Sequence, residues 1–340
     1  MERPDTSLIR PIALRLHRLP NNLVLAPMAG VTNLPMRLIS REYGAAMGFT
    51  ETVSAKGLVL GGHRSRRLLE TSPREEPVAF QLFGAEPEVL GRACALLEDE
   101  GAAWIDLNMG CPVPKFIRNG AGSALMREPL RAAAVIRAMR RSFRGTLSVK
   151  MRAGWDDRSR NAPEIARIAA AEGAELITVH GRTRAQFYRG RADPGIIRAV
   201  VEAVPGIPVL ANGDVTEPQH AFDLLRETGA AGVMIGRGAT GNPWIFRAIL
   251  ERARGATFPE PSPEERYRVL ERHIGLMRHT FPDDLQLARN LKKYLAAYSR
   301  GMPGAAAFRT RVNESDDLGR ILRLTRAFFD PGRSPTREAA

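Results

Sequence analysis

The chain has 340 residues and is 44% hydrophobic, which leaves room for one large domain of about 250 residues and a smaller one. It carries 50 lysines and arginines against 37 acidic residues, a net charge of +13, which favours a polyanionic partner such as RNA or DNA. Arginine accounts for 45 of those 50 residues, so a codon bias towards arginine is an alternative source of part of the charge.

The two cysteines, Cys94 and Cys111, lie in no CxxC pattern and near no His/Cys cluster, so we expect no metal site and a reducing compartment. No apolar run approaches the roughly 18 residues that a membrane span needs, and the first five residues lack the pattern of a signal peptide. We therefore expect a soluble, cytoplasmic protein with no membrane partner, and a monomer.

Short apolar runs bounded by glycine, proline or asparagine alternate with longer segments whose apolar residues have helical spacing. The predicted strands are Leu23–Ala26, Gly48–Thr50, Val78–Leu82, Trp104–Leu107, Leu147–Met151, Leu176–Val179, Pro208–Ala211 and Gly232–Ile235. The predicted crossover helices include Pro87–Glu100, Pro129–Arg141, Ala162–Glu172, Pro194–Ala203 and Pro218–Glu227. Eight such units favour an α/β fold of the (β/α)8 TIM-barrel type over an open doubly wound sheet, and no GxGxxG follows the first strand.

The barrel is predicted to span residues 1–252. Residues 253–263 are rich in proline and are predicted to be a linker. Residues 264–330 have helical spacing throughout, beside many basic residues, and predict an all-α helical-bundle domain with a basic face. Residues 331–340 are predicted to be a frayed tail.

Nearly every predicted strand ends in a polar or glycine-rich group, at the edge where the loops of such a fold converge. Taken alone, each is explained by the exposure of strand ends to solvent; together they predict a site. The groups are Pro27-Met28-Ala29-Gly30, Glu51, Gln81, Asn108 with Cys111, Lys150 with Arg152, His180, Asn212-Gly213-Asp214 and Gly236-Arg237-Gly238.

The last two groups follow the seventh and eighth strands, where TIM barrels often bind a phosphate through backbone N–H groups. Asn212-Gly213-Asp214 and Gly236-Arg237-Gly238 therefore predict a phosphorylated cofactor, unless their glycines only form turns. An ammonium at Lys150, directed into a barrel, is costly unless an anionic group lies near, although a lysine at the rim could also extend to water.

Cys111 has three possible roles, as a nucleophile, an acid or a small core residue. A free thiol is mostly protonated near neutral pH, which favours a proton donor. Cys94 lies on an apolar helical face and is expected only to pack. His180 is either a buried structural histidine or, beside Arg182, a contact to a ring edge or a phosphate.

With these residues the sequence resembles the tRNA-dihydrouridine synthases, and most closely their B-type bacterial subgroup. The resemblance covers nearly the whole chain. Its motifs are Leu25-Ala26-Pro27-Met28-Ala29-Gly30-Val31-Thr32, Gln81-Leu82-Phe83-Gly84, Asn108-Met109-Gly110-Cys111-Pro112, Gly122-Ser123-Ala124-Leu125, Val149-Lys150-Met151-Arg152-Ala153-Gly154-Trp155, His180-Gly181-Arg182-Thr183, Asn212-Gly213-Asp214 and Ile235-Gly236-Arg237-Gly238-Ala239.

The resemblance implies a bound FMN, reduced by NADPH or NADH, that passes a hydride to C6 of a uridine in tRNA while Cys111 protonates C5. It implies FMN contacts from Pro27, Met28, Ala29, Gln81, Lys150, His180, Asn212, Gly213, Asp214, Gly236 and Arg237. Asn108 would hold the flavin or the uracil, and Arg152 and Arg182 would contact the uridine or its phosphate. The helical domain would hold the tRNA.

Some positions depart from the family pattern, among them Asn33, Thr52 and Pro194, and in the tail Lys292-Lys293-Tyr294 and Ala297-Tyr298. They leave the modified tRNA position open. Two other functions also stay open at this point: a flavin enzyme acting on a free pyrimidine, such as a dihydroorotate or dihydropyrimidine dehydrogenase, and a non-catalytic RNA-binding barrel.

Overall fold

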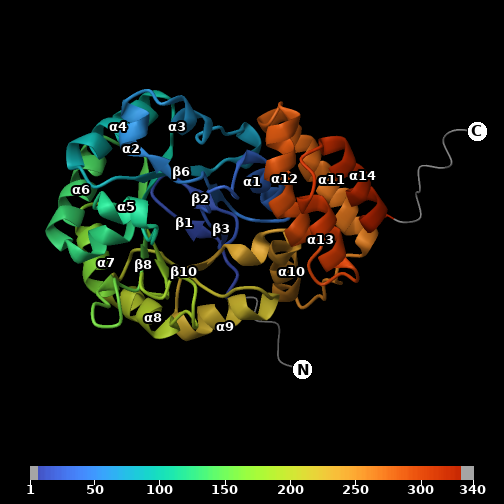
Figure 1. Ribbon diagram of the computed structural model, residues 1–340. Coiled ribbons are helices and arrows are strands. Elements are labelled where there is room, and N and C mark those ends of the chain that lie inside the picture. Colours follow the sequence, from blue (N-terminus) through green and yellow to red (C-terminus); the bar gives the residue numbers. More distant parts are fainter. Residues whose placement is uncertain (1–6, 331–340) are drawn as a thin grey trace, which may run out of the picture.

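The computed structural model describes residues 7–330, in which eight parallel strands close into a barrel surrounded by helices (Figure 1). The strand order is β3-β11-β10-β9-β8-β7-β6-β4, and the ring closes where the Leu25 N–H donates to the Met47 carbonyl at 3.0 Å. The predicted TIM barrel is confirmed. The strands are β3 (Leu23–Leu25), β4 (Gly48–Phe49), β6 (Val78–Phe83), β7 (Trp104–Met109), β8 (Thr146–Arg152), β9 (Leu176–His180), β10 (Val209–Asn212) and β11 (Gly232–Ile235).

Seven longer helices lie on the outside of the barrel and bury their apolar faces against it. Most begin with a proline in the first turn, where the missing N–H costs no hydrogen bond. The five predicted crossover helices are confirmed within one residue at each end. The helices are α1 (Leu34–Glu42), α4 (Pro87–Asp99), α6 (Pro129–Arg141), α7 (Ala162–Ala171), α8 (Pro194–Ala203), α9 (Pro218–Thr228) and α10 (Trp244–Ala253).

Several short elements were not predicted, because two to six residues show no periodicity. The hairpin of β1 (Ile12–Ala13) and β2 (Arg18–Leu19) lies at the amino-terminal end of the barrel, where His17 contacts Thr146. The others are β5 (Val53–Ser54), α2 (Ala55–Val59), α3 (His63–Arg67), η1 (Pro73–Glu75), α5 (Pro114–Arg118), η2 (Gly122–Arg127) and η3 (Arg237–Ala239). Of these, η1 lies just before β6 begins, and the rest lie in the segments that follow strand ends.

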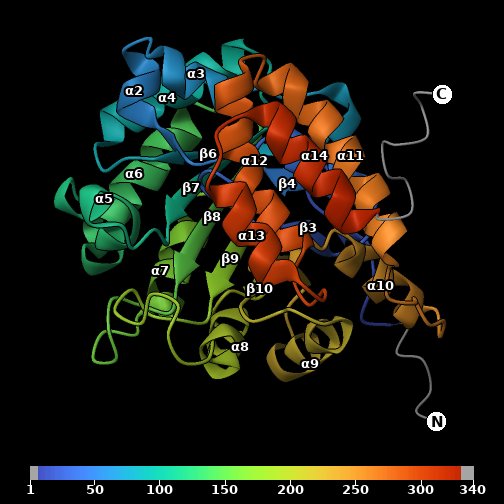
Figure 2. The ribbon, with the colours of Figure 1, turned by 45° about the vertical axis from the view of Figure 1, so that its right-hand side comes forward.

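Four further helices, α11 (Pro263–Thr280), α12 (Asp284–Tyr298), α13 (Ala305–Asn313) and α14 (Leu318–Phe329), pack together on one side of the barrel, beside α1 (Figures 1 and 2). No helix or strand covers residues 254–262, where the linker is predicted. One continuous set of buried apolar side chains runs from Ile39 of α1 to Leu270 of α11, so the barrel and these helices share a core. The division into two domains stays a prediction.

Side chains inside the barrel form two layers, because alternate residues of a strand point to the same face. The layer nearer the amino-terminal end is apolar and fully buried: Val24, Met47, Phe49, Ala79, Trp104, Leu176, Leu210 and Met234. The layer nearer the carboxyl-terminal end is polar: Gln81, Asp106, Asn108, Ser148, Lys150 and Asn212. The change of polarity places the candidate site at the carboxyl end.

None of the described helices is long and apolar enough to cross a membrane. The predictions for the first five residues and for the tail at 331–340 lie outside the described residues.

Candidate active site at the carboxyl end of the barrel

A chain of buried amides connects β6 to the loop that carries Cys111. Gln81 Nε2 donates to Asp106 Oδ2 at 2.8 Å, and Asn108 Nδ2 donates to Gln81 Oε1 at 2.8 Å. Asn108 Oδ1 then accepts the backbone N–H groups of Gly110 at 3.1 Å and Cys111 at 2.9 Å. Both ends of the Asn108 side chain are thus occupied within the protein. The structure shows it holding the cysteine loop, and its predicted contact to flavin or uracil stays a prediction.

The Cys111 loop is held from its other side by η2. The backbone N–H of Ser123 donates to the Cys111 carbonyl at 3.1 Å, and its hydroxyl donates to the same oxygen at 2.9 Å. Gly122 has φ +64°, and a Cβ there would lie 2.9 Å from that carbonyl oxygen. The close approach therefore requires glycine at this position.

The Cys111 side chain is partly buried, and burial raises the pKa of its thiol above the ordinary value. The thiol is therefore protonated at neutral pH and can donate a proton. Cys94, by contrast, is completely buried in α4, where burial raises its pKa to about 12. As predicted from the sequence, it packs in the core.

Lys150 projects from β8 into the polar layer. Its Nζ donates to Asn212 Oδ1 at 3.0 Å, and Asn212 Nδ2 in turn donates to the Met234 carbonyl at 2.8 Å. Burial, followed by the nearby charge of Arg152, lowers the pKa of Lys150 to about 8. Its other two N–H groups have no partner among the described residues, so the ammonium is available to a ligand in the barrel mouth.

His180 ends β9 and is only 8% exposed. Burial lowers its pKa well below the ordinary value, and the charges of Lys150, Arg152, Arg182 and Arg237 lower it further. The imidazole is therefore neutral at pH 7. Arg182 Nη1 lies 3.4 Å from Nε2, and because a guanidinium only donates, this contact places the ring proton on Nδ1.

Arg152 and Arg182 are buried and bonded to the protein rather than free in the mouth. Arg152 donates to the carbonyls of Gly110 at 2.7 Å, Thr183 at 2.9 Å and Phe187 at 2.8 Å. Arg182 donates to the carbonyls at 189 and 190 and to the carboxylate of Asp214. They order the loops after β7, β9 and β10, and their predicted contact to uridine stays a prediction.

The segments after β10 and β11 offer free backbone donors. The N–H groups of Gly213, Asp214, Gly236 and Arg237 donate to no acceptor among the described residues. Gly213 has φ +148°, and a Cβ there would lie 2.4 Å from that of Ala192, so the chain requires glycine. Arg237 is 60% exposed and lies 3.7 Å from the Asp214 carboxylate. This arrangement suits a phosphate group.

The loop after β3, which contains Pro27, Met28 and Ala29, is folded back on itself. The N–H groups of Val31 and Thr32 both donate to the Met28 carbonyl, at 2.9 Å and 3.0 Å. A Cβ at Gly236 would lie 3.5 Å from the Met28 sulfur, so this loop meets the segment after β11. The mouth is thereby closed into one site, bordered by the first and last strands.

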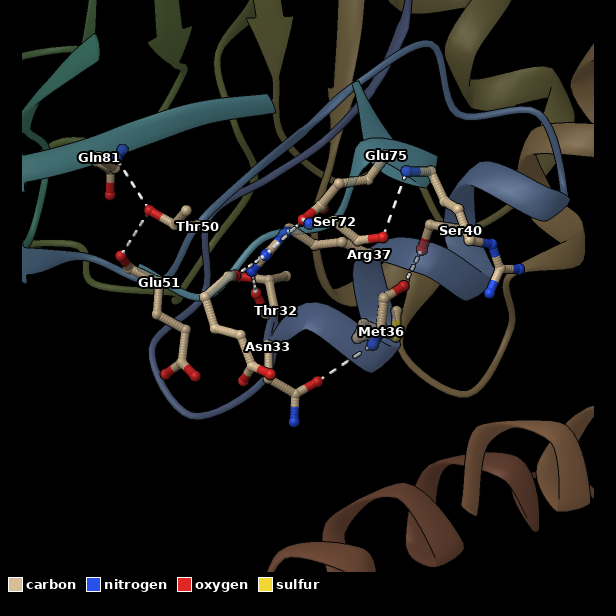
Figure 3. Close-up of polar contacts among 12 residues, drawn as sticks. Thr32, Asn33, Met36, Arg37, Ser40, Thr50, Glu51, Ser72, Glu75 and Gln81 are labelled. Atoms are coloured by element: carbon tan, nitrogen blue, oxygen red, sulfur yellow. Dashed lines mark hydrogen bonds and ion pairs between the residues drawn. The ribbon is translucent and has the colours of Figure 1, made fainter. Parts of the chain in front are cut away.

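A buried ion pair holds this loop on the barrel wall (Figure 3). Arg37 Nε donates to Glu75 Oε2 at 2.6 Å and Nη2 donates to Oε1 at 2.8 Å, and both side chains are 1% exposed. Arg37 Nη1 also donates to the Thr32 carbonyl at 2.9 Å. Figure 3 shows Asn33 capping α1 through the N–H of Met36.

Sequence reasoning gave no role to Asp106 or Tyr188, and treated Thr52 only as a departure from the family pattern. Thr52 Oγ1 contacts both Gln81 and Asn108. The exposed ring of Tyr188 lies under the guanidinium of Arg237, 4.8 Å from its centroid. Asp106 could have been noticed as a charged residue two positions from Asn108, on the same face of an otherwise apolar strand. Among the described residues, no group of three or more His, Cys, Asp or Glu side chains could hold a metal ion.

Fold and site define a (β/α)8 barrel with a thiol, a partly buried lysine and free backbone amides in one mouth. The family model for "Dihydrouridine synthase (Dus)" matches residues 24–330. A protein named tRNA-dihydrouridine synthase B from Xanthomonas axonopodis is 40% identical over 309 residues, 91% of this chain and 92% of its own. A protein of the same name from Pseudomonas putida is 38% identical over 320 residues, which cover 93% of this chain and 94% of its own. A protein named probable tRNA-dihydrouridine synthase from Rickettsia prowazekii is 39% identical over 303 residues, which cover 88% of this chain and 91% of its own.

The chain therefore belongs to the dihydrouridine synthase family, and its similarity to relatives named B agrees with the subgroup expected from the sequence.

Proposed function

We propose that the protein reduces the C5=C6 bond of uridines in tRNA to give 5,6-dihydrouridine, with bound FMN and with NADPH or NADH as the reductant. The observation that carries the proposal is the placement of Cys111. Asn108 and Ser123 hold its backbone from two sides, and burial keeps its thiol protonated, in the same mouth as the partly unpartnered ammonium of Lys150.

The residues present fit a flavin phosphate and a flavin ring. Free N–H groups at 213, 214, 236 and 237, next to Arg237, suit the phosphate, and the loop at Pro27, Met28 and Ala29 closes over the same side. Lys150, Asn212 and the neutral His180 would contact the ring, and Gln81, which is bonded to Asn108, is proposed as a further contact from the barrel interior. When bound, a flavin supplies the hydride that the reduction needs.

The chain's own residues supply the remaining chemistry. Lys150 provides a positive charge to balance the negative charge of a reduced ring. Cys111 donates its proton to C5 as C6 receives the hydride, so that both carbons become saturated and the thiolate is left to be reprotonated from solvent. Arg152, bonded to the Gly110 carbonyl, keeps the cysteine loop from moving away from that position.

The C-terminal helices are proposed to bind the tRNA. Residues 264–330 contain 13 basic and 9 acidic residues, and Arg320, Arg323 and Arg326 of α14 are all exposed. Exposed arginines of α3 adjoin this surface, because Arg67 lies 5.2 Å from the ring centroid of Phe281 and contacts Gln286 of α12. Binding through phosphates should weaken steeply as salt rises. The target base must leave its stack to enter the mouth, which is easiest in an RNA loop.

The test compares Cys111→Ala with Cys94→Ala, using purified holoprotein, unmodified tRNA and NADPH. Loss of a general acid should lower dihydrouridine formation by about 10²–10⁴-fold, while the flavin absorption band stays unchanged. The Cys94 variant, altered only in the core, should retain the activity. Dihydrouridine is measured by mass spectrometry of the digested tRNA.

A Cys111→Ala variant with normal product yield would refute the assignment of the acid. The same assay separates the two alternative functions. Turnover of free uracil without turnover of tRNA would favour a pyrimidine dehydrogenase, and a protein that takes up no FMN would favour a non-catalytic barrel.

A further inference from the structure

Asp106 is a completely buried carboxylate to which neither the sequence pattern nor the proposed chemistry gives a role. It lies in the middle of β7, two residues before Asn108, inside the barrel. Ser148 donates its hydroxyl to Oδ1 at 2.6 Å, and Gln81 donates Nε2 to Oδ2 at 2.8 Å. The Ser148 oxygen itself accepts the indole N–H of Trp104 at 2.9 Å. Each carboxylate oxygen of Asp106 therefore has a fixed donor.

The direction of each hydrogen bond in this chain follows from the carboxylate. An ionised carboxylate only accepts, so Gln81 must present its amino group to Asp106 and its carbonyl to the other side. That carbonyl then accepts Nδ2 of Asn108, which turns Oδ1 of Asn108 towards the backbone N–H of Cys111. An isolated amide could flip with little change in shape, but here the carboxylate at one end of the chain and the backbone N–H groups of Gly110 and Cys111 at the other require the same orientation of both amides.

We propose that Asp106 is a positioning residue for Cys111: its carboxylate orients Gln81, Gln81 orients Asn108, and Asn108 holds the loop that carries the thiol. The proposal rests on the proposed function of Cys111 as the acid and deepens it. Asp106 touches neither the thiol nor the ligand positions in the mouth, so it acts only through the two amides.

Asp106 is mostly ionised at neutral pH although it is buried. Burial raises its pKa to about 6, while the hydrogen bonds from Ser148 and Gln81 and the charge of Lys150 oppose that rise. The Lys150 ammonium is hydrogen-bonded to Asn212 and not to Asp106, so the carboxylate oxygens remain occupied by Ser148 and Gln81. At neutral pH the group therefore acts as an acceptor on both sides.

The decisive experiment exchanges the carboxylate and the amide. In Asp106→Asn, the amide at position 106 can adopt two orientations. In one, its NH2 group faces the NH2 group of Gln81, so that Gln81 and Asn108 must both turn around. In the other, its NH2 group faces Ser148, and the Ser148 hydroxyl proton has no acceptor. In the double variant Asp106→Asn/Gln81→Glu, the amide at position 106 accepts from Ser148 and donates to the carboxylate at position 81. The other oxygen of that carboxylate still accepts from Asn108. The double variant thus restores the orientation of Asn108.

The main measurement is the rate at which iodoacetamide alkylates Cys111, followed against pH by mass spectrometry. It is specific because the only other cysteine in the chain, Cys94, is completely buried. Asp106→Asn should change the alkylation rate and its pH profile, and lower kcat for dihydrouridine formation by about 10–100-fold with little change in the KM for tRNA. Ser148→Ala is the matched control, because it removes the bond to the other oxygen of Asp106 and leaves the amide chain intact.

The double variant should recover the wild-type alkylation profile, and part of the activity, since Gln81 is also a proposed flavin contact. Recovery of folded protein from an unstable single variant counts equally in favour. A double variant no closer to wild type than Asp106→Asn, or an Asp106→Asn variant with wild-type alkylation and kcat, would overturn the proposal. Wild-type protein that makes no dihydrouridine would instead refute the proposed function, while the alkylation data would still report on the loop.

Discussion

The hydroxyl of Tyr294 lies 3.2 Å from Oδ1 of Asn33, the residue that caps α1, and donates its proton to the neighbouring carbonyl of Val31. Tyr294 is completely buried in α12, so a helix of the C-terminal group is bonded directly to the loop after β3. That loop contains the proposed flavin contacts Pro27, Met28 and Ala29.

Tyr294→Phe should therefore affect both stability and flavin binding. Loss of the hydroxyl leaves the partly buried Val31 carbonyl without its donor, which should lower the free energy of unfolding by about 1–3 kcal/mol. The freed loop should raise the dissociation constant of FMN about tenfold, equivalent to about 1.4 kcal/mol. Urea denaturation of the flavin-free protein and fluorescence titration with FMN measure the two effects.

Tyr298→Phe is the matched control for this prediction. Tyr298 is equally buried in the same helix, and its hydroxyl contacts His273 at 3.3 Å rather than the loop. It should lose stability and keep the affinity for FMN. Equal affinity losses in both variants would mean that Tyr294 has no particular connection to the flavin loop.

The buried pair of Arg37 and Glu75 predicts strong non-additivity. Glu75→Gln leaves a guanidinium buried without its counter-charge, so the free energy of unfolding should fall by about 3–5 kcal/mol. Adding Arg37→Met to that variant should cost much less than Arg37→Met costs alone. Chemical denaturation of the four proteins of this cycle measures the coupling.

The comparison for the buried pair is a surface pair of the same residue types. Arg66 and Glu100 are 49% and 42% exposed, so Glu100→Gln should change the free energy of unfolding by less than about 1 kcal/mol. If Glu75→Gln lowered the free energy of unfolding by as little as Glu100→Gln, burial would not make the Arg37–Glu75 pair more costly to break.

The desolvated ammonium of Lys150 predicts an unusual dependence of stability on pH in the flavin-free protein. The pKa is about 8 in the folded chain against the ordinary 10.5, so between these values the unfolded chain binds more protons. The folded state is therefore stabilised as pH rises through this window, by at most about 1.4 kcal/mol per pH unit, and the cost of burying the cation is fully present below pH 8.

Lys150→Met isolates this contribution from other groups that titrate in alkaline solution. The free energy of unfolding of the wild type, minus that of the variant, should increase between about pH 8 and pH 10 when both are denatured with urea. A constant difference across that range would show that the ammonium is hydrated.

The barrel could be predicted from the sequence because its strands and helices follow simple physical rules. Val149 and Met151 of β8, for example, alternate with residues facing the interior, and proline marks the first turn of α8. The hairpin of β1 and β2 could not, since a strand of two residues has no period. The Tyr294–Asn33 contact could not either, because it joins residues 261 positions apart.

The sequence predicted that the polar residues of the candidate site gather at the carboxyl end of the barrel, but it did not predict the hydrogen bonds among them. Arg152 and Arg182 look like free cations in the sequence, yet the loops bring backbone carbonyls to them, and carbonyl positions depend on loop conformation rather than residue type. Asp106 was missed because it lies inside an apolar run, where its partners Gln81 and Ser148 come from other strands.

The apolar layer fills the barrel below the site, so we expect ligands to reach the site only from the carboxyl end. Trp104, Leu176 and Met234 are fully buried side chains that fill the amino-terminal half, and the indole N–H of Trp104 donates upwards to Ser148. In the proposed reaction, the reductant, the flipped base and the solvent proton that restores the thiol would then all use the same opening. Under that proposal we expect the reductant and the RNA to bind one after the other.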